Sequence, residues 1–142
     1  MLRRNDTYLQ HLAVVPLFAA CSKKELGLIS RRAEQISIDP GRVITKEGAS
    51  GHEFFVILEG SATVSRGGRK IATLGAGDYF GELALLDRAP RNATVTATTE
   101  LEVVVLGQRE FSGLLDEVPG LAHKLLIGMA RRLREADANR VH

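Results

Sequence analysis

Glycine is concentrated in the middle of this 142-residue chain, and that distribution restricts the fold it can adopt. Nine of the fourteen glycines lie between Gly41 and Gly81. Glycine weakens a helix interior by about 1 kcal/mol relative to alanine and is favoured in tight turns. We therefore expect short strands joined by turns, with Gly67 and Gly68 at a hairpin tip. The predicted strands are 54–58, 61–65, 69–74, 94–98 and 102–106.

Helical patterns flank this strand-rich middle. Residues 6–12 and 22–34 have helical character, and Ser22 with Glu25 three residues later predicts a capping box. After Gly107 the helical period returns in two segments, marked by Phe111, Leu114 and Leu115 and then, from Pro119, by Leu121, Leu125, Met129 and Leu133. The chain is therefore predicted to be an α+β domain in which helices precede and follow a group of strands.

The composition is that of an ordinary globular domain, with 44% hydrophobic and 25% charged residues. A net charge of +2 is too small to indicate nucleic-acid or membrane binding by itself. The single Cys21 cannot form an internal disulfide, which favours a reducing, cytoplasmic location. Pro16 interrupts the apolar run 12–20, and no apolar run reaches the ~20 residues of a membrane span. We expect neither a signal peptide nor a membrane partner.

The segment 80–95, FGELALLDRAPRNATV, carries the clearest chemistry. Gly81 and Glu82 begin a short apolar segment, and Arg91 follows Glu82 by nine residues. Glycine before a helix N-terminus lets backbone N–H groups approach an anion, and the helix dipole favours negative charge there. Arginine adds a planar fork of donors that matches a phosphate, and a carboxylate accepts hydrogen bonds from hydroxyls such as those of ribose. Together these residues indicate a site for a small sugar phosphate.

The same segment resembles the phosphate-binding cassette of the cyclic nucleotide-binding domain family. That cassette runs Phe-Gly-Glu-Leu-Ala-Leu, a short gap, and Pro-Arg-x-Ala-Thr-Val, which residues 80–85 and 90–95 fit. Further resemblances cover nearly the whole chain, at 15–18, 25–26, 57–60, 64, 74–80 and 129–133. The resemblance implies an antiparallel β-roll (jelly-roll-like) flanked by N-terminal and C-terminal helices, with a short cassette helix in the roll.

The resemblance also predicts the domain organisation. We expect one cyclic nucleotide-binding domain over residues 1–142, with N-terminal helices at 6–36. A β-roll at 40–107 would contain the cassette 80–95, and hinge and closing helices would follow at 108–138.

In the family's cassette, the arginine equivalent to Arg91 pairs with the exocyclic oxygens of the cyclic phosphate. Glu82 would accept the ribose 2′-hydroxyl, and Gly81 would permit close approach of the backbone. The N–H groups of Leu83 and Ala84 would point at the phosphate. The resemblance thus implies a binding site made by these five residues.

The base is predicted to lie between the strands and the closing helix. Val64 and Leu74 would line its walls, although apolar strand residues are usually core, and Arg132 or Leu133 would cover it. In the family the residue after the arginine is often alanine or serine in cAMP readers and threonine in many cGMP readers. Asn92 holds that position here. Because the threonine is absent, we expect cAMP to be favoured over cGMP.

No catalytic or metal-binding pattern is found in the sequence. The four histidines are scattered, Cys21 has no neighbouring base, and Phe80 stands where a dinucleotide fingerprint would have its third glycine. We therefore expect a non-enzymatic protein without a cofactor.

The predicted function is a cyclic nucleotide sensor, a regulatory module that signals to a protein partner or effector domain by movement of its C-terminal helices. One alternative is a degenerate domain that acts as a protein–protein module and binds no nucleotide. Another is a regulatory fragment of a transcription factor or channel. We expect no DNA binding by this chain alone, and a homodimer through the closing helix stays open.

Overall fold

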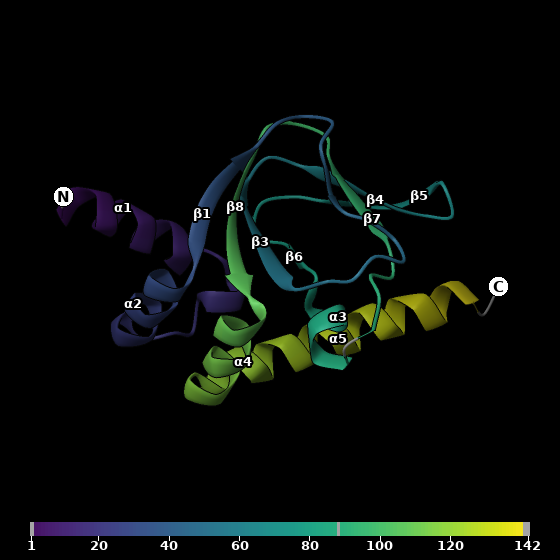
Figure 1. Ribbon diagram of the computed structural model, residues 1–142. Coiled ribbons are helices and arrows are strands. Elements are labelled where there is room, and N and C mark those ends of the chain that lie inside the picture. Colours follow the sequence, from purple (N-terminus) through teal and green to yellow (C-terminus); the bar gives the residue numbers. More distant parts are fainter. Residues whose placement is uncertain (1, 88, 141–142) are drawn as a thin grey trace.

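Two four-stranded antiparallel sheets form a β-roll, with helices at both ends of the chain (Figure 1). The computed structural model describes residues 2–87 and 89–140, without the side chains of residues 2–7, 83–84, 87 and 136–140. The predicted α+β class and β-roll are confirmed. The elements in chain order are α1 (Leu2–Ala13), η1 (Pro16–Phe18), α2 (Lys23–Arg32), β1 (Glu34–Ile38), β2 (Val43–Thr45), β3 (Glu53–Glu59), β4 (Ala62–Arg66), β5 (Arg69–Leu74), β6 (Tyr79–Phe80), α3 (Glu82–Asp87), β7 (Thr94–Ala97), β8 (Leu101–Gly107), α4 (Gln108–Glu117) and α5 (Pro119–Arg140).

The strands β3 and β8 are central to the architecture because both of their faces are buried. The sheet orders are β1-β8-β3-β6 and β2-β7-β4-β5. Successive strand side chains point to opposite faces. Phe54 and Val56 of β3 therefore pack against the helices, whereas Phe55 and Ile57 pack inside the roll. Burial on both faces explains why these strands are continuous apolar runs rather than alternating ones.

The helices cover the outer face of the β1-β8-β3-β6 sheet. Their buried side chains join those of β3 and β8 in one cluster, which includes Leu12, Phe18, Ile29, Phe111, Leu114, Leu121 and Leu125. The predicted capping box at the start of α2 is confirmed. Ser22 Oγ accepts from the Glu25 backbone N–H at 3.1 Å, and Glu25 Oε1 accepts from the Ser22 N–H at 2.9 Å. Among residues 2–87 and 89–140, no helix combines the length and apolar character needed to cross a bilayer.

The first strand begins inside the range predicted as helical. The expected helical range 6–36 is wrong at its end, because α2 ends at Arg32 and β1 spans Glu34–Ile38. In β1 the apolar Ile36 and Ile38 alternate with polar residues, which is the period of a strand. Both isoleucines belong to the cluster inside the roll, and β1 pairs antiparallel with β8. Burial against the second sheet therefore decides the conformation of this segment.

The long helix α5 approaches the roll closely at Gly128. A Cβ at this position would lie 2.1 Å from the Tyr79 hydroxyl oxygen, so any side chain would collide with β6. Tyr79 also contacts the Phe54 ring, with centroids 5.7 Å apart. Gly128 thus allows α5 to pack against the strand that leads directly into the cassette.

We expect Gly128→Ala to destabilise the protein, although glycine to alanine in a helix interior normally stabilises by about 1 kcal/mol. The overlap with Tyr79 should reverse the sign and lower the melting temperature by roughly 3–8 °C. Gly120→Ala is the matched control in the same helix, because its Cβ would meet no atom within 4 Å. Adding Tyr79→Phe should restore the Gly128→Ala protein, and equal melting temperatures for the two alanine variants would contradict the packing argument.

Candidate ligand-binding site

A cavity of about 500 Å³ lies between the β4–β5 hairpin, the cassette segment 80–95 and α5. Its walls combine apolar strand residues with charged groups, as is typical of small-molecule sites. The residues that line it are Thr45, Val64, Arg66, Ala72, Thr73, Leu74, Asp78, Tyr79, Phe80, Gly81, Glu82, Arg91, Asn92, Ala93, Val95, Arg132 and Glu135.

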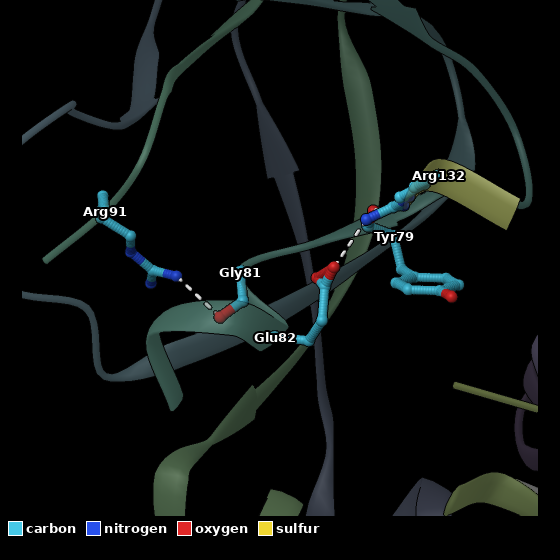
Figure 2. A network of polar contacts seen from close by, with 5 residues as sticks. All are labelled: Tyr79, Gly81, Glu82, Arg91 and Arg132. Atoms are coloured by element: carbon cyan, nitrogen blue, oxygen red, sulfur yellow. Dashed lines mark hydrogen bonds and ion pairs between the residues drawn. The ribbon is translucent and has the colours of Figure 1, made fainter. Parts of the chain in front are cut away.

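Arg91 is one of the few buried charged residues in the described part of the chain, with 8% of its surface exposed. Its Nη1 donates to the Gly81 carbonyl at 3.0 Å (Figure 2). Its Nη2 donates to the Glu53 carbonyl at 2.8 Å. Burial lowers the pKa of Arg91, and the nearby carboxylates of Glu53 and Glu82 partly offset this. A guanidinium has five N–H donors, so three remain for an anion after these two bonds.

Glu82 supplies the complementary acceptor. It is the first residue of α3 and only 1% exposed. Its Oε1 accepts from Arg132 Nη1 at 2.6 Å, whereas its Oε2 is buried and has no hydrogen-bond partner among the described residues. A buried acceptor without a partner costs free energy, so it is a natural position for a donor from a ligand.

Arg132 connects the cavity to α5. Besides its bond to Glu82, its Nη2 donates to the Tyr79 carbonyl at 3.0 Å, and its guanidinium carbon lies 4.8 Å from the centroid of the Tyr79 ring. Burial raises the pKa of Tyr79, and Arg132 partly counters this shift. Figure 2 shows Arg132 and Arg91 on opposite sides of the start of α3. The adjacent residues Gly81 and Glu82 therefore accept hydrogen bonds from the two cationic groups of the site.

Most residues predicted for the site do meet at the cavity. Gly81, Glu82, Arg91, Asn92 and Arg132 line it, as do the wall residues Val64 and Leu74. Gly81 has φ of 98°, which only glycine adopts readily, and a Cβ there would lie 2.7 Å from Arg91 Nη1. The side chains of Leu83 and Ala84 lie outside the described set, as does residue 88 of the cassette. The direction of their N–H groups stays a prediction.

Leu133 does not join the cavity. It is 66% exposed and absent from the cavity lining, so of the two lid residues expected from the sequence only Arg132 reaches the site. The reason is helical geometry, because adjacent helix residues point about 100° apart. Leu121 and Leu125 of the predicted apolar stripe are buried in the core, which explains that part of the stripe without a dimer.

Several lining residues were not predicted from the sequence. Ala72 pairs across the hairpin with Val64, so strand alternation could have placed it on the cavity side. Glu135 lies one helical turn beyond Arg132, the spacing that puts two side chains on one face. For Tyr79, Thr45 and Arg66 the local sequence carried no comparable signal.

The comparisons with known proteins agree with this geometry. The family profile described as "Cyclic nucleotide-binding domain" matches residues 35–118, which is more than half of the chain. The chain belongs to the cyclic nucleotide-binding domain family. In that family the domain is a regulatory, non-catalytic module.

The chain is similar to regulatory subunits of protein kinases. It is 36% identical over 135 residues to a cAMP-dependent protein kinase regulatory subunit from Hypocrea atroviridis, covering 94% of this chain and 29% of the relative. It therefore spans under a third of that curated relative. A structure described as Sp-2Cl-cAMPS bound to PKAR CBD2 has a TM-score of 0.80 and 31% identity, covering 96% of this chain and 93% of that one. The regulatory subunit of a cAMP-independent protein kinase A from Trypanosoma brucei has a TM-score of 0.84 and 25% identity, covering 98% of this chain and 50% of that one.

Arg132→Ala should destabilise the ligand-free protein because it leaves the buried Glu82 carboxylate without a partner. We expect a loss of about 1–2 kcal/mol, less than for a fully buried pair because Arg132 is half exposed. Arg131→Ala, on the exposed face of the same helix, is the matched control and should change the free energy of unfolding by less than about 0.5 kcal/mol. Urea unfolding measures both.

The same substitution in a Glu82→Gln background tests the cause. Arg132→Ala should lower the free energy of unfolding by less in this background, because a neutral amide is less costly to leave unpaired than a carboxylate. A loss of the same size in both backgrounds would show that the packing of Arg132 on Tyr79, rather than the ion pair, stabilises α5.

Proposed function

We propose that this domain binds a cyclic nucleotide and acts as a regulatory sensor, with cAMP favoured over cGMP. The observation that carries the proposal is the pairing of a buried arginine with a buried, half-unpartnered carboxylate in one cavity. Arg91 keeps three donors for a phosphate, and Glu82 Oε2 is an acceptor for a ribose hydroxyl. Figure 2 shows the Arg91 guanidinium and the Glu82 carboxylate on opposite sides of Gly81, and we propose that one ribose cyclic phosphate bridges them.

The proposed preference for cAMP rests on the residue type at position 92 rather than on the geometry of the cavity. Asn92 lines the cavity at the position where many cGMP readers of the family carry threonine. Its backbone carbonyl accepts from Arg66 Nε at 2.9 Å, which fixes the main chain beside Arg91. The relative from Hypocrea atroviridis is itself named as cAMP-dependent. These points support cAMP as the ligand of this domain.

The output of the sensor is the position of α5. A ligand can shift a conformational equilibrium only by binding one state more tightly than another. A ribose that bonds to Glu82 changes the partners of the carboxylate that holds Arg132, and Arg132 is part of α5. We propose that this link carries occupancy of the cavity to a protein partner or effector domain. A cytoplasmic location, which the single cysteine favours, is part of the same proposal.

A domain that keeps the fold without binding cyclic nucleotide is the second candidate. The regulatory subunit from Trypanosoma brucei, which belongs to a protein kinase A named as cAMP-independent, has the same fold at a TM-score of 0.84. In addition, Glu82 Oε1 is already occupied by Arg132, so an ion pair satisfies part of the site without a ligand. The presence of both Glu82 and Arg91 favours nucleotide binding over this second candidate.

Thermal unfolding with cAMP, cGMP and 5′-AMP tests the proposal directly. A ligand at ~100 times its dissociation constant stabilises the folded state by roughly 2.7 kcal/mol, which should raise the melting temperature by roughly 5–10 °C. We expect the largest shift with cAMP, a smaller one with cGMP and none with 5′-AMP. Arg91→Ala should abolish the shifts. An unchanged melting temperature with both cyclic nucleotides would leave the second candidate.

Glu82→Ala should weaken cAMP more than 2′-deoxy-cAMP, because only cAMP offers the 2′-hydroxyl. A hydrogen bond to a charged group contributes about 1.5–3 kcal/mol, so we expect a loss of at least about tenfold for cAMP and a much smaller one for the deoxy analogue in calorimetric titrations. Glu135→Ala, which removes another carboxylate that lines the cavity, should affect the two ligands alike. Equal losses for Glu82→Ala would remove its assigned role.

A further inference from the structure

The loop 46–51 makes unusually close contact with Arg91. The Gly48 N–H donates to the Arg91 carbonyl and the Arg91 N–H donates to the Ala49 carbonyl, each at 2.8 Å. Glu53, two residues beyond the loop, accepts from the Arg91 guanidinium through its carbonyl. The loop and its continuation into β3 therefore hold both the backbone and the side chain of this arginine.

Gly51 is the point where the loop touches the guanidinium itself. A Cβ at residue 51 would lie 2.3 Å from Arg91 Nε, 2.4 Å from Cζ and 2.8 Å from Cδ. The three nearest atoms all belong to Arg91, so the space of the missing side chain is filled by the arginine. Gly51 does not have a positive φ, unlike Gly48 and Gly81, so alanine is compatible with its backbone. The need for glycine at this position is therefore steric.

We propose that Gly51 is a positioning residue for the phosphate-binding arginine, and that the absence of a side chain at this position sets where the Arg91 guanidinium lies. This inference rests on the proposed function for its effect on ligand binding. The guanidinium is held by two carbonyls, and it occupies the space that a side chain at residue 51 would need. A methyl group there forces the arginine to move, and a shift of about 1 Å at a positioning group is costly for binding.

A stability cycle with Gly51→Ala, Arg91→Ala and the double variant tests the steric contact without any ligand. Gly51→Ala should lower the melting temperature by about 5 °C or more in the wild-type background. In the Arg91→Ala background it should change the melting temperature by about 1 °C or less, because the colliding atoms are gone. Gly75→Ala is the matched control, since its Cβ would meet no atom within 4 Å and its φ is not positive. Gly75→Ala should leave the melting temperature unchanged in both the wild-type and the Arg91→Ala background.

The cycle has an informative result even if Gly51→Ala alone does not fold. Folding of the double variant would then support the contact, and failure of both would overturn it. Equal losses in the two backgrounds would also overturn it, since Gly51 would then act through something other than Arg91.

Binding separates this inference from the proposed function. If the wild-type protein binds cAMP, Gly51→Ala should weaken cAMP and cGMP by a similar factor of about ten or more at a temperature where the variant is folded, because the phosphate is common to both. Unchanged affinity would overturn the positioning role. If the wild-type protein binds neither nucleotide, the proposed function fails. The steric contact is then still tested by the stability cycle, and equal effects of Gly51→Ala in the two backgrounds would refute it.

Discussion

The burial of two opposite charges at the start of α3 is the constraint on which the rest of the site depends. Taking a guanidinium and a carboxylate out of water is costly unless each finds partners. Arg91 finds them in two backbone carbonyls and Glu82 in Arg132, a residue from the far end of the chain. Three distant segments, the start of β3, the cassette and α5, are thereby linked around one cavity.

Much of this arrangement could be predicted from the sequence because its signals are local. The capping box at Ser22, the helical period after Gly107 and the spacing of Glu82 and Arg91 each involve residues near one another in the chain. Strand β1 was missed because its five residues lie directly after a helix, and their short apolar alternation gains its extended conformation from burial inside the roll and pairing with β8. The sequence could not decide whether Arg132 or Leu133 covers the site. The face of α5 that is turned toward the roll depends on the contact between Gly128 and Tyr79, which are distant in the sequence.

The roles of glycine in this chain differ, although the sequence presents all of them in the same way. At Gly81 the backbone conformation demands glycine. At Gly51 and Gly128 the backbone is ordinary and the neighbouring side chain demands it. The first kind can be predicted from a turn pattern, whereas the second depends on atoms that lie forty or more residues away in the sequence. A glycine-rich sequence thus contains long-range packing information that becomes visible only in three dimensions.

The length of α5 has a mechanical consequence. Its first half is anchored in the core by Leu121 and Leu125, whereas Leu126 and Leu133 are exposed. From Gly128 to Arg140 the helix extends about 18 Å at 1.5 Å per residue. A tilt of about 10° about that point would move the end of the helix by about 3 Å, much farther than any atom in the cavity need travel. Under the proposed function, a change in the hydrogen-bond partners of Arg132 would tilt α5 slightly, and the length of the helix would enlarge that tilt into a displacement at its C-terminal end.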